Sequence, residues 1–253
     1  MGMRSIGFAG VILAMSLTPL RAGITYQLRS EGPKGAVVFM VRAEGKAYRA
    51  QAEISDGLTE LQRQYPIVIS TDGGATQRYL RPDDKTWYEQ SSRPAGLIAI
   101  GTHPRLQEPA VSLTEEISND VVDGRPTRRF VLKASCVVES DIDTETVRLH
   151  KSVIALFSVT DIDCAPRVAE QFGRPMFGIE DIDERVRLQL ASIDGLIVRQ
   201  TISRTERYDG GLPRTSITKT EVINVHCVDL KSTLFAVPKD YRHQEPIMRG
   251  PGR

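Results

Sequence analysis

The chain lacks the short motifs that most often mark an active site. It has no HExxH or Cys-x-x-Cys spacing for a metal, no Gly-x-Ser-x-Gly turn for a hydrolase nucleophile, and no glycine-rich phosphate loop. Its four histidines are scattered, and its 32 acidic residues single out no catalytic pair. The tripeptide Asp-Ile-Asp occurs three times without calcium-loop spacing, so turns and helix caps explain it better. We therefore expect no catalytic residue, no metal site and no cofactor, and we predict that the protein is not an enzyme.

An excess of either charge is also absent. Lys and Arg number 33 against 32 Asp and Glu, which gives no broad electrostatic attraction to nucleic acid. Beyond residue 22, no apolar run is long enough to span a bilayer as a helix. We expect no nucleic-acid partner and no transmembrane segment in the mature chain.

Residues 1–22 have the layout of a secretory signal peptide. A basic start precedes the uncharged stretch 5–17, Pro19 then breaks the chain, and Ala22 is a small residue at the expected cleavage point. The apolar stretch is too short for a stable membrane-spanning helix. We expect cleavage before Gly23 and export to the periplasm, or beyond it as a secreted protein. The alternative is that these residues form a buried N-terminal helix.

Alternation of apolar and polar residues predicts that the mature chain is mainly β. This pattern is typical of a strand with one buried and one solvated face. Turn sequences rich in Asp and Gly separate the alternating runs, as they do in hairpins. In the last run the apolar stripe is Ile217, Ile223, Val225 and Cys227. We expect an antiparallel meander with strands at 37–43, 48–54, 128–138, 147–159, 196–202 and 217–227.

One helical segment is expected within an insertion at about 165–192. Asp181 can cap a helix over 182–191, and Glu184 stands three residues later, as in a capping box. Ile182, Val186 and Leu190 then share one helical stripe. A shorter helix is expected at 166–172.

Three cysteines allow one disulfide and leave one thiol after export. Pairing of the two strands around the 140–145 turn places Cys136 far along a strand from Cys164. Pairing around Gly210 places Cys227 near the point where the chain after Cys164 returns to the sheet. The predicted disulfide therefore joins Cys164 and Cys227, and Cys136 is predicted to be a buried free thiol.

Four segments together resemble the outer-membrane lipoprotein carrier superfamily, the LolA/LolB-like proteins. The resemblance covers nearly all of 23–243 and implies one α+β, mainly β domain. Its sheet would be a strongly curved antiparallel half-barrel, with a few short helices covering the apolar concave face. In some members this concavity holds acyl chains. The segments are YLRPDDKTWYEQ (79–90), TDIDC (160–164), GLIVRQTISRTERYDGG (195–211) and LFAVPKDY (234–241).

The C-terminal tail, 244–253, is rich in Pro, Gly and Arg and is expected to be disordered.

Seven apolar side chains lie on the apolar parity of their strands and are expected to point into the concavity. If the concavity is open, it would bind a lipid-like or other apolar ligand, with Ile182, Val186 and Leu190 on a lid. The alternative is that these three side chains and the run 97–100 fill it as a plug. The expected ligand-binding residues are Phe39, Val41, Phe130, Leu132, Phe157, Leu196 and Val198.

Two functions follow from these alternatives. The first is an exported periplasmic protein that binds a lipid-like ligand such as an acyl chain. The second is an envelope interaction or scaffold protein with a filled core and a protein partner on its surface or sheet edge. A cavity large enough for an acyl chain favours the first, and a filled core with an exposed apolar patch favours the second.

Overall fold

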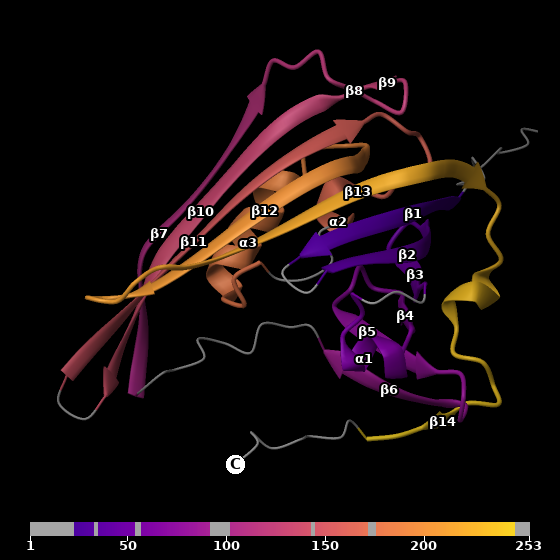
Figure 1. Ribbon diagram of the computed structural model, residues 1–253, viewed down its shortest axis with the longest axis horizontal. Coiled ribbons are helices and arrows are strands. Elements are labelled where there is room, and N and C mark those ends of the chain that lie inside the picture. The colour runs from indigo at the N-terminus through magenta and orange to yellow at the C-terminus, as the bar shows by residue number, and fades with distance from the viewer. Residues whose placement is uncertain are drawn as a thin grey trace, which may run out of the picture.

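A computed structural model describes residues 23–32, 35–53, 57–91, 102–142, 145–171 and 176–245 (Figure 1). The protein is mainly β, as predicted, and is built on one 12-stranded sheet that is antiparallel except at β14. The predicted signal peptide, the run 97–100 and residues 246–253 lie outside the described residues. No helix in the described part of the chain is long and apolar enough to cross a membrane.

The described part of the chain contains fourteen strands, three α-helices and one 3-10 helix. The strands are β1 Gly23–Gly32, β2 Gly35–Glu44, β3 Ala47–Ala52, β4 Ile67–Ser70, β5 Thr76–Arg81, β6 Thr86–Ser91, β7 Thr102–Glu116, β8 Val121–Val122, β9 Arg125–Pro126, β10 Arg128–Ile142, β11 Glu145–Thr160, β12 Leu196–Tyr208, β13 Arg214–Val228 and β14 Arg242–His243. The helices are α1 Glu60–Gln64, α2 Val168–Gln171, α3 Glu180–Leu190 and the 3-10 helix η1 Ser232–Phe235.

Two antiparallel meanders join into the single sheet. The strand order is β14-β6-β5-β4-β3-β2-β1-β13-β12-β11-β10-β7. The first meander, β1 to β6, and the second, β10 to β13, meet where β1 pairs with β13. The sheet is open, with β7 at one edge and β14 at the other. The small hairpin of β8 and β9 is separate from it.

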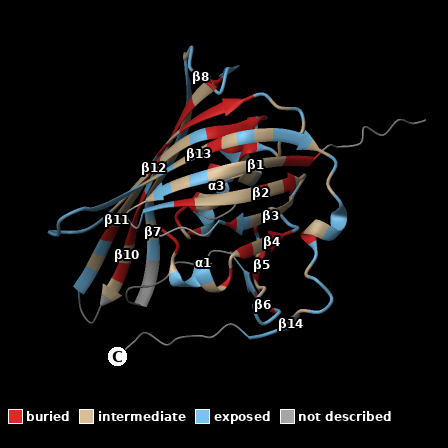
Figure 2. Cartoon of the chain, turned by 45° about the vertical axis from the view of Figure 1, so that its right-hand side comes forward, coloured by how far each residue is buried: buried red, intermediate tan, exposed pale blue. Residues whose placement is uncertain are grey.

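The face of the sheet that carries α1 and α3, here called the helical face, is continuous from β5 to β10. In the described strands, buried residues alternate with more exposed ones (Figure 2). Following the register from strand to strand places Phe39, Val41, Phe130, Leu132 and Phe157 on this face. A bulge in β12 at Val198 shifts the pairing with β11, so that Val159 pairs with Ile197 and Thr160 with Leu196. For these five residues, on β2, β10 and β11, the period-two pattern of the sequence agrees with one shared face.

Helix α3 covers the half of the helical face formed by β7, β10 and β11. Its buried side chains are Ile182, Val186 and Leu190, the three that the sequence assigned to a lid or plug. They belong to one core cluster with Phe130 and Phe157. This half of the face is filled with large apolar side chains.

The predicted capping box of α3 is wrong. The N-cap is Ile179 and makes no side-chain bond, while Glu184 instead pairs with Arg187 on the helix surface. The carboxylate of Asp183 accepts hydrogen bonds from the backbone N–H groups of Phe177 (2.9 Å) and Ile179 (3.0 Å). Burial raises the pKa of Asp183, although these bonds act in the opposite direction. The helix start is therefore held by a side chain from inside the first turn.

The C-terminal segment covers the opposite face of the sheet at β4 to β6. Phe235 of η1 packs there against Ile69 and Leu80, which are fully buried. Lys85 forms an ion pair with Asp240 (2.9 Å). Two of the segments that carry the family resemblance, 79–90 and 234–241, thus lie against each other.

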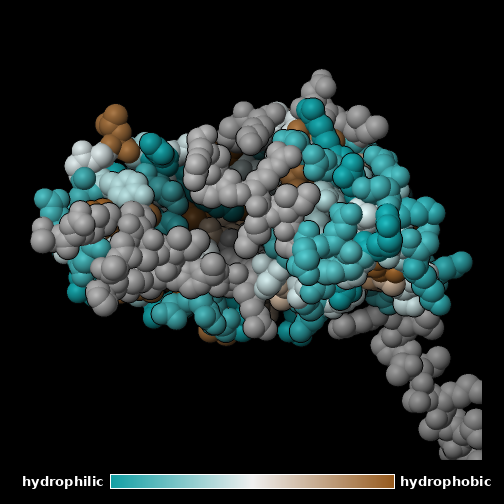
Figure 3. Space-filling model, turned by 90° about the horizontal axis from the view of Figure 1, so that it is seen from below, coloured by the Kyte–Doolittle hydropathy of each residue, from teal (hydrophilic) through white to brown (hydrophobic). Residues whose placement is uncertain are grey.

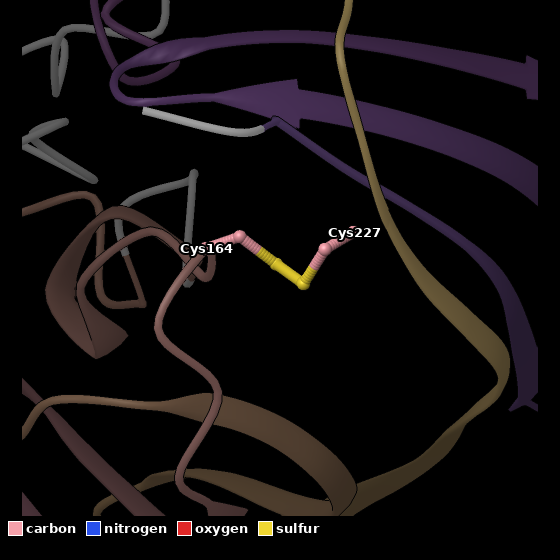
Figure 4. The surroundings of a disulfide bond; sticks show 2 residues. All are labelled: Cys164 and Cys227. Atoms are coloured by element: carbon pink, nitrogen blue, oxygen red, sulfur yellow. A yellow bond between two sulfur atoms is a disulfide. The ribbon is translucent and has the colours of Figure 1, made fainter. Parts of the chain in front are cut away.

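The predicted disulfide is confirmed. Cys164, in the loop before α2, is bonded to Cys227 of β13, with 6.1 Å between their Cα atoms (Figure 4). Cys136 is a buried free thiol, and burial raises its pKa. The apolar stripe predicted for β13 is partly wrong, because Ile217 is 49% exposed.

A β-bulge explains this difference in β13. Thr25 pairs with His226 whereas Gln27 pairs with Ile223, so β13 has one extra residue there. Asn224, within the bulge, has a positive φ of 56°. The extra residue reverses the alternation, so that Val222 and Cys227 both face the helical side although they are five positions apart.

Candidate functional site

A cavity of about 450 Å³ lies between α1 and the helical face of β1 to β5. This volume is within the range of roughly 300–1,000 Å³ for small-molecule sites. Seen from below, apolar side chains are visible in a hollow near the middle of the view, and most of the coloured side chains around it are hydrophilic (Figure 3). The cavity floor is formed by Tyr26, Leu28, Phe39, Val41, Ala43, Ala50, Ala52 and Val68.

Short side chains on β3 create this space. The register places Ala50 opposite Val41 and Ala52 opposite Phe39, all directed to the helical face. Under α3, by contrast, two phenylalanines face each other across β10 and β11. One sheet face therefore carries a filled half and a hollow half. In the filled half Ala134 and Ala155 lie in one core cluster with the buried side chains of α3, whereas α1 contributes no buried residue over Ala50 and Ala52.

Helix α1 forms the other wall of the cavity. A capping box holds its start, in which the Gln62 N–H donates to the Thr59 hydroxyl oxygen (3.2 Å) and the Thr59 N–H donates to the Gln62 side-chain oxygen (2.9 Å). Unlike α3, this helix contributes no fully buried residue. Leu61 lines the cavity and remains 46% exposed. An apolar ligand in the cavity would cover this side chain.

Tyrosine hydroxyls supply polar groups within the mainly apolar wall. The Tyr79 hydroxyl donates to the side-chain oxygen of Gln77 (2.6 Å), whose Nε2 donates to the Tyr48 hydroxyl (2.9 Å). Burial raises the pKa of Tyr26 above its usual range, and neighbouring Tyr48 raises it further. The Tyr26 hydroxyl, which is protonated at neutral pH like that of any tyrosine, therefore also keeps its proton at a higher pH.

An aromatic cluster stiffens the end of the cavity at β5 and β6. The Tyr79 and Tyr88 rings are stacked with centroids 4.8 Å apart, and Tyr65 meets Tyr88 edge-on at the same distance. All three tyrosines are buried. Tyr65 and Tyr79 also line the cavity. Such contacts stabilise the wall independently of any ligand.

The cavity lining includes Phe39 and Val41 from the expected ligand-binding set, and the other five residues are packed elsewhere. Phe130, Leu132 and Phe157 are in the core under α3. Leu196 and Val198 are in a smaller cluster with Ile24, Ala43, Val122 and Val222, between the two halves of the face. The helical face thus contains both of the alternatives considered from the sequence, a filled region and a cavity.

Residue-by-residue reasoning missed α1 and most of the cavity. One signal was present, because Thr59 and Gln62 have capping-box spacing. A second signal was the small size of the apolar residues that alternate in the run 48–54, where Ala50 and Ala52 follow Tyr48. Small apolar residues at inward positions can leave space unfilled. A pattern that distinguishes only apolar from polar residues ignores side-chain size and therefore does not reveal this space.

The described cavity lining contains no Asp, Glu, His or Cys. These are the side chains that most often serve as general acids, bases and nucleophiles. Among the described residues of the whole chain, no three His, Cys, Asp or Glu side chains gather closely enough to hold a metal ion. Comparison of the chain with protein-family models and with curated protein sequences finds no match.

Proposed function

We propose that this is an exported periplasmic protein that binds one lipid-like ligand in the cavity between α1 and β1 to β5. The supporting observation is a mainly apolar cavity of about 450 Å³, with Ala50 and Ala52 in its floor and with a wall formed by α1, which has no fully buried residue. Burial of apolar ligand surface there would provide about 0.8 kcal/mol per CH₂ group. We also propose that the sheet is strongly curved, as in the half-barrel of the LolA/LolB-like proteins.

The observation that supports the scaffold alternative is the filled core under α3, which needs no ligand. It would also need a gathered apolar patch for a protein partner. The large apolar side chains that are exposed among the described residues come instead from separate helices, strands and loops. They are Leu61, Ile117, Val121, Ile154, Leu188, Tyr208, Leu212 and Ile217. Two of these, Ile154 and Ile217, lie on the face opposite to α3 with Ser203 between them. The observation that favours the binding function over the scaffold is the cavity.

The proposed export is tested by the mass of the protein isolated from its native host. Cleavage of the signal sequence should give a chain that begins at or close to Gly23. Retention of Met1 or Gly2 in the intact mass would contradict export by this route.

Ala50→Phe should abolish ligand binding while the protein stays folded. Ala50 is half-buried and lines the cavity, so the added ring enters empty space. The matched change Ala155→Phe should destabilise the fold by roughly 1–3 kcal/mol, because Ala155 faces the same side in the filled half and is fully buried. Titration of a fluorescent fatty-acid probe measures binding, and circular dichroism during urea unfolding measures stability.

A chain-length series sharpens the same experiment. Within the cavity, each added methylene should tighten binding about fourfold, since about 0.8 kcal/mol per CH₂ is gained. Unchanged probe binding by folded Ala50→Phe would place the ligand elsewhere. Absence of binding by the wild-type protein at every chain length would support the scaffold function instead.

A further inference from the structure

Lys46 lies at one end of the cavity. It occupies the tip of the hairpin between β2 and β3, where Gly45 adopts a positive φ of 55°. Lys46 is exposed, yet it belongs to the cavity lining. It is the single charged residue among the described lining residues, which include no carboxylate. The charge of the described lining is therefore positive and concentrated at one point.

None of the ion pairs between described residues uses the Lys46 ammonium group. The neighbouring turn is held against the hairpin through backbone, because the Gly73 N–H donates to the Lys46 carbonyl oxygen (2.9 Å). The acidic residue of that turn, Asp72, has other partners. Its carboxylate accepts from the Ser70 hydroxyl (2.8 Å) and the Thr76 N–H (2.9 Å). Lys46 is thus a lining residue whose ammonium group has no carboxylate partner among the described residues.

The remainder of the floor leads away from this charge. Tyr48, Ala50 and Ala52 follow Lys46 along β3 and line the cavity in turn. At about 3.3 Å per residue, the floor from Tyr48 to Ala52 is roughly 13 Å long. Leu61 of α1 is also part of the lining. The cavity is therefore polarised, with one cation at the hairpin tip and an extended apolar floor beyond it.

We propose that the ligand is a single-chain anionic amphiphile, whose head group lies beside Lys46 and whose acyl chain lies over the alanine floor. The inference rests on the proposed function and adds the charge of the ligand and its direction in the cavity. An ammonium group next to apolar surface favours a carboxylate or phosphate head group over a neutral or cationic one.

The test compares ligands that share one chain and differ in head group. Dodecanoate, 1-dodecanol and dodecylammonium displace a bound fluorescent probe from the folded protein at pH 8 and low ionic strength. Wild-type protein should prefer dodecanoate. Lys46→Gln should weaken dodecanoate binding roughly two- to fivefold, the range for an exposed ion pair, and leave dodecanol unchanged. Added salt should reduce the wild-type preference in the same direction.

Lys133→Gln is the matched control. Lys133 is also exposed and lies on β10, on the face opposite to α3, and its replacement changes the net charge equally. This variant should bind all three ligands as the wild type does. Acetate, which has the anion without the chain, should not displace the probe.

Each failure has a separate meaning. Equal affinity of the wild type for dodecanoate and dodecanol would overturn the assignment of an anionic ligand while leaving lipid binding intact. An equal loss in Lys133→Gln and Lys46→Gln would show a general charge effect and overturn the role of Lys46. Displacement by acetate would point to a free-anion site. Absence of displacement by every long-chain ligand would refute the proposed function itself.

Discussion

Phe157→Asp is expected to unfold the protein. Phe157 is 1% exposed and stacks on Phe130 across β10 and β11, with ring centroids 5.5 Å apart. Truncation of such a side chain alone costs about 3–5 kcal/mol. Placing a carboxylate in this apolar core without a partner adds several kcal/mol more. The total approaches or exceeds the roughly 5–15 kcal/mol that stabilises a typical protein, so far-ultraviolet circular dichroism should show loss of the native β signal.

Ile154→Asp is the control for this change. Ile154 lies on the same strand, three residues away on the opposite face, and is 44% exposed. A carboxylate there stays in water, so the free energy of unfolding should change by about 1 kcal/mol or less. Native stability in Phe157→Asp, or equal damage in both variants, would contradict the assignment of β11 to one buried and one solvated face.

Val186→Asp extends the experiment to α3. Val186 is 4% exposed and shares the core cluster of Phe157. If α3 is a plug, this variant should unfold as Phe157→Asp does. If α3 is instead a lid over a ligand, the variant should keep its fold and change only in binding of the fatty-acid probe. The structure places α3 over the filled half and α1 beside the cavity, so we expect unfolding.

Alternation depends only on local geometry, and it predicted six strands of the sheet, β2, β3 and β10 to β13, but not β1, β4 to β7 or β14. The run 128–138 falls within β10 and the run 147–159 within β11. The alternating apolar side chains of both runs point to the helical face. Helix α3 was predicted within two residues at its start because its apolar stripe is regular. In these elements, one periodic pattern was enough to assign both structure and burial.

Other features depend on partners far apart in the chain. Nothing local indicates that β1 pairs with β13, or that η1 covers β4 to β6 from the opposite face. The bulge at Asn224 reverses the alternation within β13, so a stripe drawn straight through 217–227 mixes the two faces. The cavity also escaped prediction, because it arises from missing volume above Ala50 and Ala52 and not from the apolar pattern.

Loss of the disulfide is the second change with a large expected effect. Cys164 and Cys227 are separated by 63 positions in the sequence. A link of that span restricts the unfolded chain by about 4 kcal/mol in the loop-entropy model. The double variant Cys164→Ala/Cys227→Ala should therefore unfold at a markedly lower urea concentration than the wild type. Dithiothreitol should lower the wild-type midpoint to a similar value and leave the double variant unchanged.

Cys136→Ala provides the comparison within the same set of cysteines. Cys136 is a buried free thiol, so its removal should cost only about 1 kcal/mol and should leave the response to dithiothreitol intact. Loss of that response in Cys136→Ala would show that Cys136 participates in the disulfide. The double variant should also bind the fatty-acid probe more weakly, because Pro166 and Gln171 follow Cys164 closely and line the cavity. By tying the loop before α2 to β13, the disulfide holds that side of the cavity wall against the sheet.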